Sequence, residues 1–213
     1  MIGILGGMGT QAGLDFCNKL AMLNRGKIDQ KYPLFILYNK SNIPGRPENL
    51  HKYNKVLKSL IKGCILLQRN KCKFIVIPCN TAHYWYNDLQ KKIKIPIISM
   101  PKEVYLHAKK NCIKNSKIGI LATEGTLKTN VYNKFFDKNF ELIAPKKSVQ
   151  IKNVNKAIKY VKMGKIRDAE KAIKSAVNYL IKMKCKKIIL GCTELPIAIF
   201  AFKSFKKIKR SKI

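Results

Sequence analysis

Two of the seven cysteines stand where a thiol could do chemistry. Cys79 and Cys192 each end a short apolar run, in FIVIPCNT and KIILGCTE, and polar residues follow both. Helices are predicted to begin just afterwards, near Ala82 and near Leu195. A thiol at the amino end of a helix lies among unpaired N–H donors and near the positive end of the helix dipole, which favours the thiolate. Each of these cysteines is therefore a candidate base.

The remaining cysteines are interpreted as small apolar core residues, because that is the usual role of an isolated buried thiol. They are Cys17, Cys64, Cys72, Cys112 and Cys185. Seven is an odd number and no pair has C-x-x-C spacing, so the sequence indicates neither a disulfide framework nor a zinc site. The thiols are expected to be reduced.

A pair of such thiols suits one class of reaction. Inversion at the Cα of an amino acid requires a base that removes the proton from one face and an acid that returns a proton to the other. A thiolate and a thiol supply that pair, and they exchange roles when the reaction runs in the opposite direction. The sequence carries no motif for a metal or a pyridoxal cofactor, so the reaction is predicted to need no cofactor.

An internal repeat indicates how the two cysteines are positioned. IGILGGMGT (2–10) recurs as IGILATEGT (118–126), with six of nine positions identical. The cysteine runs follow at nearly equal spacing, 74 positions from Leu5 to Cys79 and 71 from Leu121 to Cys192. Two signals in the same order argue for duplication. Two halves are predicted, residues 1–99 and 100–213, each with one of the cysteines.

The segments between the predicted strands have the apolar spacing of amphipathic helices. Helices are expected at 15–26, 55–68, 155–161 and 169–183, and further strands at 34–38 and 95–98. This alternation predicts an α/β fold of two pseudo-symmetric Rossmann-like halves, with parallel sheets flanked by helices. Functional groups of such sheets gather outside the carboxyl ends of the strands. The active site is therefore expected in the cleft between the halves.

The glycine-rich opening allows a second interpretation. Residues 7–12, GMGTQA, fit the loose G-x-G-x-x-G/A dinucleotide pattern after a strand. The related loop of the second half keeps only Gly125 and Thr126, so the feature that both share is a tight strand-to-helix turn. Nicotinamide binding is disfavoured, and a phosphate or carboxylate contact by backbone N–H groups is the preferred interpretation.

The charge is strongly positive, with 44 Lys and Arg against 11 Asp and Glu, a formal net charge of +33. Nucleic-acid binding could explain it, but only five basic residues are Arg and the lysines are scattered along the chain. A solvated lysine surface that attracts anionic substrates is favoured over specific nucleic-acid binding. No apolar run could span a bilayer, and the opening is too short for a signal peptide, so a cytoplasmic protein without a membrane partner is expected.

Four motifs together resemble the aspartate/glutamate racemase superfamily, and most closely its aspartate racemase branch. They are GGMG at 6–9, IPGR at 43–46, PCNTAH at 78–83 and GCTE at 191–194. The resemblance extends from Met1 to about Phe200. Glutamate racemases typically open with Asp-Ser-Gly and carry His after the second Cys-Thr, whereas this chain has Gly-Gly-Met and Glu194 there. The resemblance thus favours an aspartate or broad-specificity enzyme.

The resemblance also implies roles for individual residues. Cys79 and Cys192 match the catalytic thiols, while Arg46 matches a carboxylate clamp, against the simpler interpretation of a solvated loop charge. Lys162 matches a substrate-contacting lysine, although a chance match among 39 lysines is equally expected. His83 is left out of the catalytic pair, because a histidine at this place is as often a structural hydrogen-bond partner. The implied substrate-binding residues are Met8, Arg46, Asn80, Thr81, Thr123, Lys162, Thr193 and Glu194.

The implied partner is a small acidic amino acid, aspartate or glutamate, and the implied assembly is a homodimer. The sequence departs from the family at its end, where the basic segment from about residue 203 lacks the expected final strand and helix. The last structural element is therefore expected to be missing or degraded. Two alternatives stay open: a remnant that only binds acidic amino acids, and a related cysteine-dependent isomerase or decarboxylase of dicarboxylates.

Overall fold

The computed structural model describes residues 1–136 and 140–200. The basic segment from 203 lies outside the described residues. The chain divides into two compact units, Met1–Met100 and Pro101–Ile213. Each unit is an α/β structure built on a parallel sheet flanked by helices, as the alternating pattern predicts.

The first unit contains four parallel strands in the order β2-β1-β3-β4. The strands are β1 (Ile2–Gly6), β2 (Phe35–Asn39), β3 (Phe74–Val76) and β4 (Ile97–Ile98). The α-helices are α1 (Thr10–Leu23), α2 (Tyr53–Arg69) and α3 (Tyr86–Lys92). Short 3₁₀ helices are η1 (Asp29–Lys31), η2 (Leu50–Lys52) and η3 (Thr81–Trp85).

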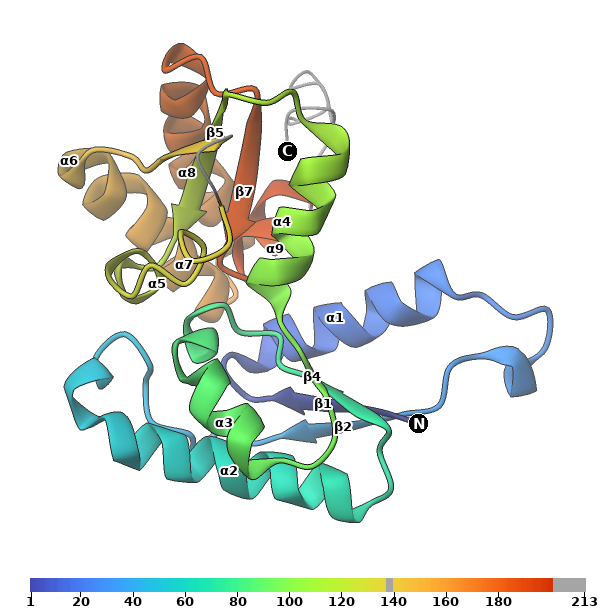
Figure 1. The fold of residues 1–213 in the computed structure, drawn as a ribbon. Coiled ribbons are helices and arrows are strands. Elements are labelled where there is room, and N and C mark those ends of the chain that lie inside the picture. Colours follow the sequence, from blue (N-terminus) through green and yellow to red (C-terminus); the bar gives the residue numbers. More distant parts are fainter. Residues whose placement is uncertain (137–139, 201–213) are drawn as a thin grey trace. The chain divides into compact units, whose positions relative to one another are not determined.

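Helices cover both faces of this sheet because neighbouring residues of a strand point to opposite faces. A Cβ added to Gly63 of α2 would meet the side chain of Leu5, whereas one added to Gly13 of α1 would lie 3.5 Å from the Cα of Gly6. Figure 1 shows α1 on one side of the strands and α2 on the other. The buried residues of α2 have the predicted three-four spacing, and they are Val56, Leu60, Gly63, Cys64 and Leu67.

The second unit has three parallel strands in the order β6-β5-β7. The strands are β5 (Ser116–Ala122), β6 (Phe140–Ile143) and β7 (Lys187–Gly191). The helices are α4 (Met100–Asn111), which begins at the junction, then α5 (Glu124–Lys128), α6 (Lys147–Val149), α7 (Lys156–Lys162), α8 (Ile166–Lys182) and α9 (Leu195–Phe200), with a π-helical segment η4 (Gln150–Asn155). The order β6-β5-β7 repeats the order β2-β1-β3 of the first unit, which agrees with the duplication inferred from sequence.

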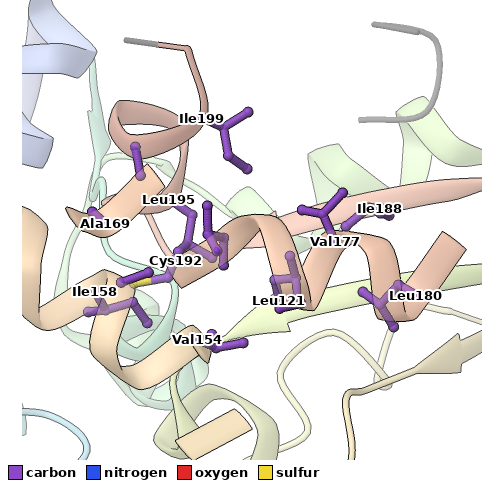
Figure 2. Close-up of a cluster of buried hydrophobic side chains, with 14 of the residues drawn as sticks. Leu121, Val154, Ile158, Ala169, Val177, Leu180, Ile188, Cys192, Leu195 and Ile199 are labelled. Atoms are coloured by element: carbon purple, nitrogen blue, oxygen red, sulfur yellow. The ribbon is translucent and has the colours of Figure 1, made fainter. Parts of the chain in front are cut away.

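The core of the second unit lies where α7, α8 and α9 pack on β5 and β7. From α8 it takes Ala169, Ile173, Ala176, Val177 and Leu180, again at helical spacing. Figure 2 shows Cys192 among these side chains, together with Ile158 of α7 and Leu195 of α9. The second cysteine therefore lies at the edge of a packed core.

The structure corrects two sequence expectations. The helix predicted near Ala82 is the 3₁₀ helix η3, and the α-helix α3 begins only at Tyr86. The helix predicted at 155–161 is α7, and the π-helical segment η4, which begins at Gln150, leads directly into it. A π-helical turn has one residue more than an α-helical turn, and across this wide turn the side chain of Gln150 is hydrogen-bonded to that of Asn155.

Candidate active site

The first cysteine follows a tight turn after β3. Cys79 lies three residues beyond Val76, and its backbone N–H donates to the carbonyl oxygen of Ile77 at 2.7 Å. The side chain is 6% exposed and belongs to one buried cluster with Met8 and Ile43. The turn thus places the thiol in the region where the glycine-rich opening and the IPGR loop meet.

His83 stabilises this turn through hydrogen bonds to the backbone. Its Nε2 accepts the backbone N–H of Met100 at 3.1 Å, so the ring proton is assigned to Nδ1, which donates to the carbonyl oxygen of Cys79 at 3.0 Å. Burial lowers the pKa of His83, which favours this neutral form. Both ring nitrogens are hydrogen-bonded to the backbone, so His83 acts here as a structural hydrogen-bond partner.

The opening loop depends on Gly7. Its φ is +88°, and an added Cβ would lie 2.3 Å from the carbonyl carbon of Lys40. Only glycine fits both the left-handed backbone and this close approach. The turn lets α1 begin at Thr10, soon after β1, so the helix starts and ends earlier than the expected 15–26.

Arg46 is buried against the same loop, with 8% of its surface exposed. Its Nη2 donates to the carbonyl oxygen of Met8 at 2.8 Å, and its Nη1 donates to those of Ile43 at 3.3 Å and Pro44 at 3.1 Å. Within residues 1–136 and 140–200, its Nε has no hydrogen-bond partner and no carboxylate lies within 4.0 Å of the guanidinium. Arg46 is therefore a fixed, buried positive charge with a donor still available, and not a solvated loop charge.

Asn80 and Thr81 follow Cys79 and are both buried. Asn80 precedes η3, and its carbonyl oxygen accepts the N–H of His83 at 3.0 Å. The first unit thus brings together Met8, Arg46, Cys79, Asn80 and Thr81, the candidate residues that the sequence assigns to it.

The second cysteine follows β7 without an intervening residue. Cys192 is 5% exposed, and its thiol donates to Oε2 of Glu194 at 3.0 Å. The hydroxyl of Thr193 donates to the same oxygen at 3.5 Å. The GCTE motif therefore folds into a compact turn in which a thiol and a carboxylate meet.

Strand pairing places Thr123 beside this turn. Ala122 of β5 is paired with Gly191 of β7, so Thr123 and Cys192 each follow a paired residue at the carboxyl end of the sheet. A Cβ on Gly191 would lie 3.0 Å from that of Ala122, which explains the glycine before the cysteine. The hydroxyl of Thr123 caps α5 by accepting the N–H of Thr126 at 3.1 Å.

Lys162 forms no side-chain hydrogen bond or ion pair with this group among the described residues. It lies at the last position of α7 with an exposed side chain. In the described part of the chain, no ion pair joins it to Glu194. Its predicted contact with substrate stays a prediction.

Two structural features near Cys192 are not apparent from the sequence motifs. Tyr132 is fully buried, and burial raises its pKa. Gln150 donates to the carbonyl oxygen of Ala122 at 2.9 Å and to Oδ1 of Asn155 at 2.8 Å. Asn155 in turn donates to Oε1 of Glu124 at 2.7 Å. A polar chain thus reaches the carboxyl end of β5, and the only sequence signal for it is a pair of amides five residues apart.

The described residues show no sign of two other kinds of site, a metal centre and a membrane-spanning helix. Among residues 1–136 and 140–200, no three His, Cys, Asp or Glu side chains are grouped so that they could hold a metal ion. Over the same residues, no helix combines the length and the apolar character needed to cross a membrane.

Comparison with known proteins adds to this geometry. The family model described as Asp/Glu/Hydantoin racemase matches residues 5–204. A broad-specificity amino-acid racemase of Bacillus subtilis is 27% identical over 205 residues, which cover 92% of this chain and 86% of that protein.

Solved structures show the same similarity. The aspartate racemase of Picrophilus torridus superposes with a TM-score of 0.82 at 28% identity, over 97% of this chain and 85% of its own. An aspartate racemase homologue from Pyrococcus horikoshii has a TM-score of 0.73 at 25% identity, over 93% and 87%. A glutamate racemase of Francisella tularensis, solved with D-glutamate, has a TM-score of 0.70 at 20% identity over 97% and 73%, a likeness of fold alone.

Proposed function

The chain belongs to the Asp/Glu/hydantoin racemase family, and we propose that it is a cofactor-independent racemase that interconverts the L and D forms of aspartate or glutamate. One observation carries this proposal. The two sheets share an equivalent strand order, in which β3 of the first corresponds to β7 of the second. A buried cysteine follows each of these strands, Cys79 after β3 and Cys192 after β7.

The proposed reaction needs no group beyond these two. One cysteine, as thiolate, takes the Cα proton and becomes a thiol, and the electron pair of the broken C–H bond stays on the substrate as a carbanion. The other cysteine gives its proton to the opposite face of Cα and becomes a thiolate. Proton exchange with water restores the starting state. The reverse reaction uses the same groups with their roles exchanged.

Selection of an acidic amino acid is assigned to Arg46. A guanidinium binds a carboxylate through parallel N–H donors, and the Arg46 Nε lies buried with no partner in the described residues. The buried positive charge is offset by no acidic side chain within 4.0 Å among these residues, so an anionic substrate would supply the missing counter-charge. Asn80, Thr81, Thr123 and Thr193, together with the backbone at Met8, are the proposed contacts for the remaining polar groups of the substrate.

The relatives' names bear on the substrate. Those of higher identity include an aspartate racemase and a broad-specificity amino-acid racemase. We therefore propose aspartate as the preferred substrate, with glutamate as the second one to test. A cytoplasmic location and a homodimer stay predictions of the sequence.

The test is incubation of the purified protein with L-aspartate, and separately with L-glutamate, in deuterated water without added cofactor. Chiral analysis and mass measurement then follow both the enantiomer and the label. Appearance of the D enantiomer with deuterium at Cα supports the proposal. The protein carrying both Cys79→Ser and Cys192→Ser is the matched control for contaminating racemases.

Two other outcomes would contradict the proposal. Binding of aspartate without any exchange at Cα would identify a remnant that has kept only the binding site. Loss of carbon dioxide, or a changed carbon skeleton, would identify a decarboxylase or an isomerase of dicarboxylates.

A further inference from the structure

The turn after β7 gives Cys192 a partner that Cys79 lacks. The Cys192 thiol donates to Oε2 of Glu194 at 3.0 Å, and only 3% of Glu194 is exposed. Its other oxygen, Oε1, is buried without a hydrogen-bond partner among the described residues. In the same part of the chain, no carboxylate is hydrogen-bonded to the Cys79 thiol. The two related halves therefore differ in the group that faces the sulfur.

This difference acts on the proton of Cys192. A hydrogen bond from a thiol to a carboxylate stabilises the neutral thiol. A thiolate at the same position would place two negative charges about 3 Å apart in a buried site, where repulsion is stronger than in water. The hydrogen bond to Glu194 therefore favours the neutral thiol over the thiolate at Cys192.

Two titratable groups of the described residues are placed against Cys192. They are Glu194, from the same turn, and Tyr132, from the segment after α5. Burial raises the pKa of Tyr132, so its phenol stays neutral. Thr193, which donates to Glu194 at 3.5 Å, is uncharged. No Lys or Arg of the described residues lies within 4.0 Å of the Glu194 carboxylate to offset its charge.

We propose that Glu194 is a positioning residue that keeps Cys192 protonated, so that in the resting protein Cys192 is the proton donor and the role of base falls to Cys79. The part that concerns catalysis rests on the proposed function. With substrate bound, Cys79 takes the Cα proton and Cys192 gives its own. The opposite direction begins from the state in which Cys192 has lost its proton. This role differs from the substrate contact that the family resemblance implies for Glu194.

The test measures thiol reactivity without substrate. Glu194→Gln keeps the size of the side chain but removes the negative charge. Alkylation by iodoacetamide is followed across a pH series, and mass measurement of the peptides reports Cys192 and Cys79 separately. In Glu194→Gln we expect Cys192 to react about tenfold faster at neutral pH, which corresponds to one unit in the pH at which the thiolate forms, while Cys79 is unchanged.

Glu141→Gln is the matched control. Glu141 lies on β6 of the same unit, its side chain is 59% exposed, and its ion partner Lys117 is 3.8 Å away. This variant removes the same charge far from the strand end that carries Cys192, so both thiols should react as in the wild type. Unchanged or slower alkylation of Cys192 in Glu194→Gln would overturn the proposal.

A second measurement does not require the reagent to reach a buried sulfur. The ultraviolet absorbance of the Cys192 thiolate is the difference between a protein and the same protein with Cys192→Ser. This difference is measured once in the wild-type background and once in the Glu194→Gln background, and it should appear at lower pH in the Glu194→Gln pair. Equal titration in both pairs would overturn the proposal, and circular dichroism checks that each variant is folded.

Activity separates this inference from the proposed function. In an active racemase, the alkaline limb of the rate profile reports loss of the donor's proton, so it should move to lower pH in Glu194→Gln. A limb that stays in place would contradict the donor role of Cys192. If the wild type racemises no acidic amino acid, the proposed function fails, while the two thiol measurements still decide whether Glu194 holds the proton of Cys192.

Discussion

The ring Nδ1 of His83 donates a hydrogen bond of 3.0 Å to the backbone carbonyl oxygen of Cys79. The same ring accepts the N–H of Met100, the first residue of α4, at 3.1 Å. One neutral imidazole therefore connects the turn that carries the first cysteine to the start of the helix that follows β4. A protonated ring would lose the second hydrogen bond, because Nε2 would no longer be an acceptor.

This relationship predicts a pH dependence of stability. Burial lowers the pKa of His83 in the folded protein below its ordinary value of 6.5. At a pH between the folded and the unfolded pKa, the unfolded chain therefore binds more protons than the folded one. The free energy of unfolding should therefore fall as the pH drops below about 6.5. Thermal unfolding at a series of pH values measures it. His83→Asn keeps a donor near the Nδ1 position and should flatten the slope, whereas an equal slope in His51→Asn and wild type is the expected control result.

The second prediction concerns the two cysteines as a pair. Cys79→Ser and Cys192→Ser should each abolish racemisation with little change in fold, because a hydroxyl has nearly the same size but supplies almost no base at neutral pH. Each variant can be assayed for exchange alone, because abstraction and return can occur at the remaining thiol. We expect the two variants to exchange the Cα proton of opposite enantiomers in deuterated water.

Cys64 supplies the control for this pair. It is fully buried in α2, and burial raises the pKa of its thiol to about 12. Cys64→Ala should change stability as an ordinary small core substitution does and leave racemisation intact. Appreciable racemisation by either single serine variant, beyond that of the double variant, would exclude a mechanism that uses both thiols.

The third prediction is that Arg46 selects the carboxylate. Arg46→Lys keeps a positive charge but loses the planar fork, so binding of aspartate should weaken by about 1–3 kcal/mol, measured by calorimetry. The hydrogen bonds to Met8, Ile43 and Pro44 are also affected, so the melting temperature should fall. Arg69→Lys, in the last turn of α2, makes the same exchange on an exposed side chain and should alter neither property. Unchanged affinity in Arg46→Lys would place Arg46 outside the site.

The fourth prediction tests the opening loop. Gly7→Ala introduces a Cβ 2.3 Å from the carbonyl carbon of Lys40 at a φ of +88°, so the loop must move. We expect a loss of several degrees in melting temperature together with weaker binding of the acidic substrate, since the neighbouring Met8 carbonyl anchors Arg46. The control is Gly164→Ala, which has a φ of +74° but no atom within 4 Å of the added Cβ. It should be strained by the backbone alone and leave binding unchanged.

The sequence predicts the framework of this protein well because the framework is repeated. The related segments at 2–10 and 118–126 fold as equivalent strand-and-turn units, and the two cysteine runs contain the strands β3 and β7 that pair with them. Helical spacing likewise identifies α2 and α8. The ends of elements are less predictable, as at η3, because the choice between a 3₁₀ and an α turn depends on backbone contacts such as those of His83 with Cys79 and Met100.

The candidate site is only partly visible in the sequence. Motifs identify Cys79, Cys192 and Arg46 by residue type and place. They do not identify Tyr132 or Gln150, because the position of each depends on how distant segments pack around the ends of β5 and β7. The direction of the Glu194 side chain is likewise a property of the folded turn. It points to the neighbouring thiol, which no spacing rule specifies.

The π-helical segment η4 is a place where related sequences could change in length with a large structural effect. A helix advances by about 100° per residue, so deleting one position within 150–155 would turn everything before it relative to α7. Gln150 would leave the Ala122 carbonyl, although no side chain in contact with Cys192 had been altered. Insertions and deletions of single residues at this segment are therefore a route by which related proteins could reshape the surroundings of the second cysteine while retaining every motif.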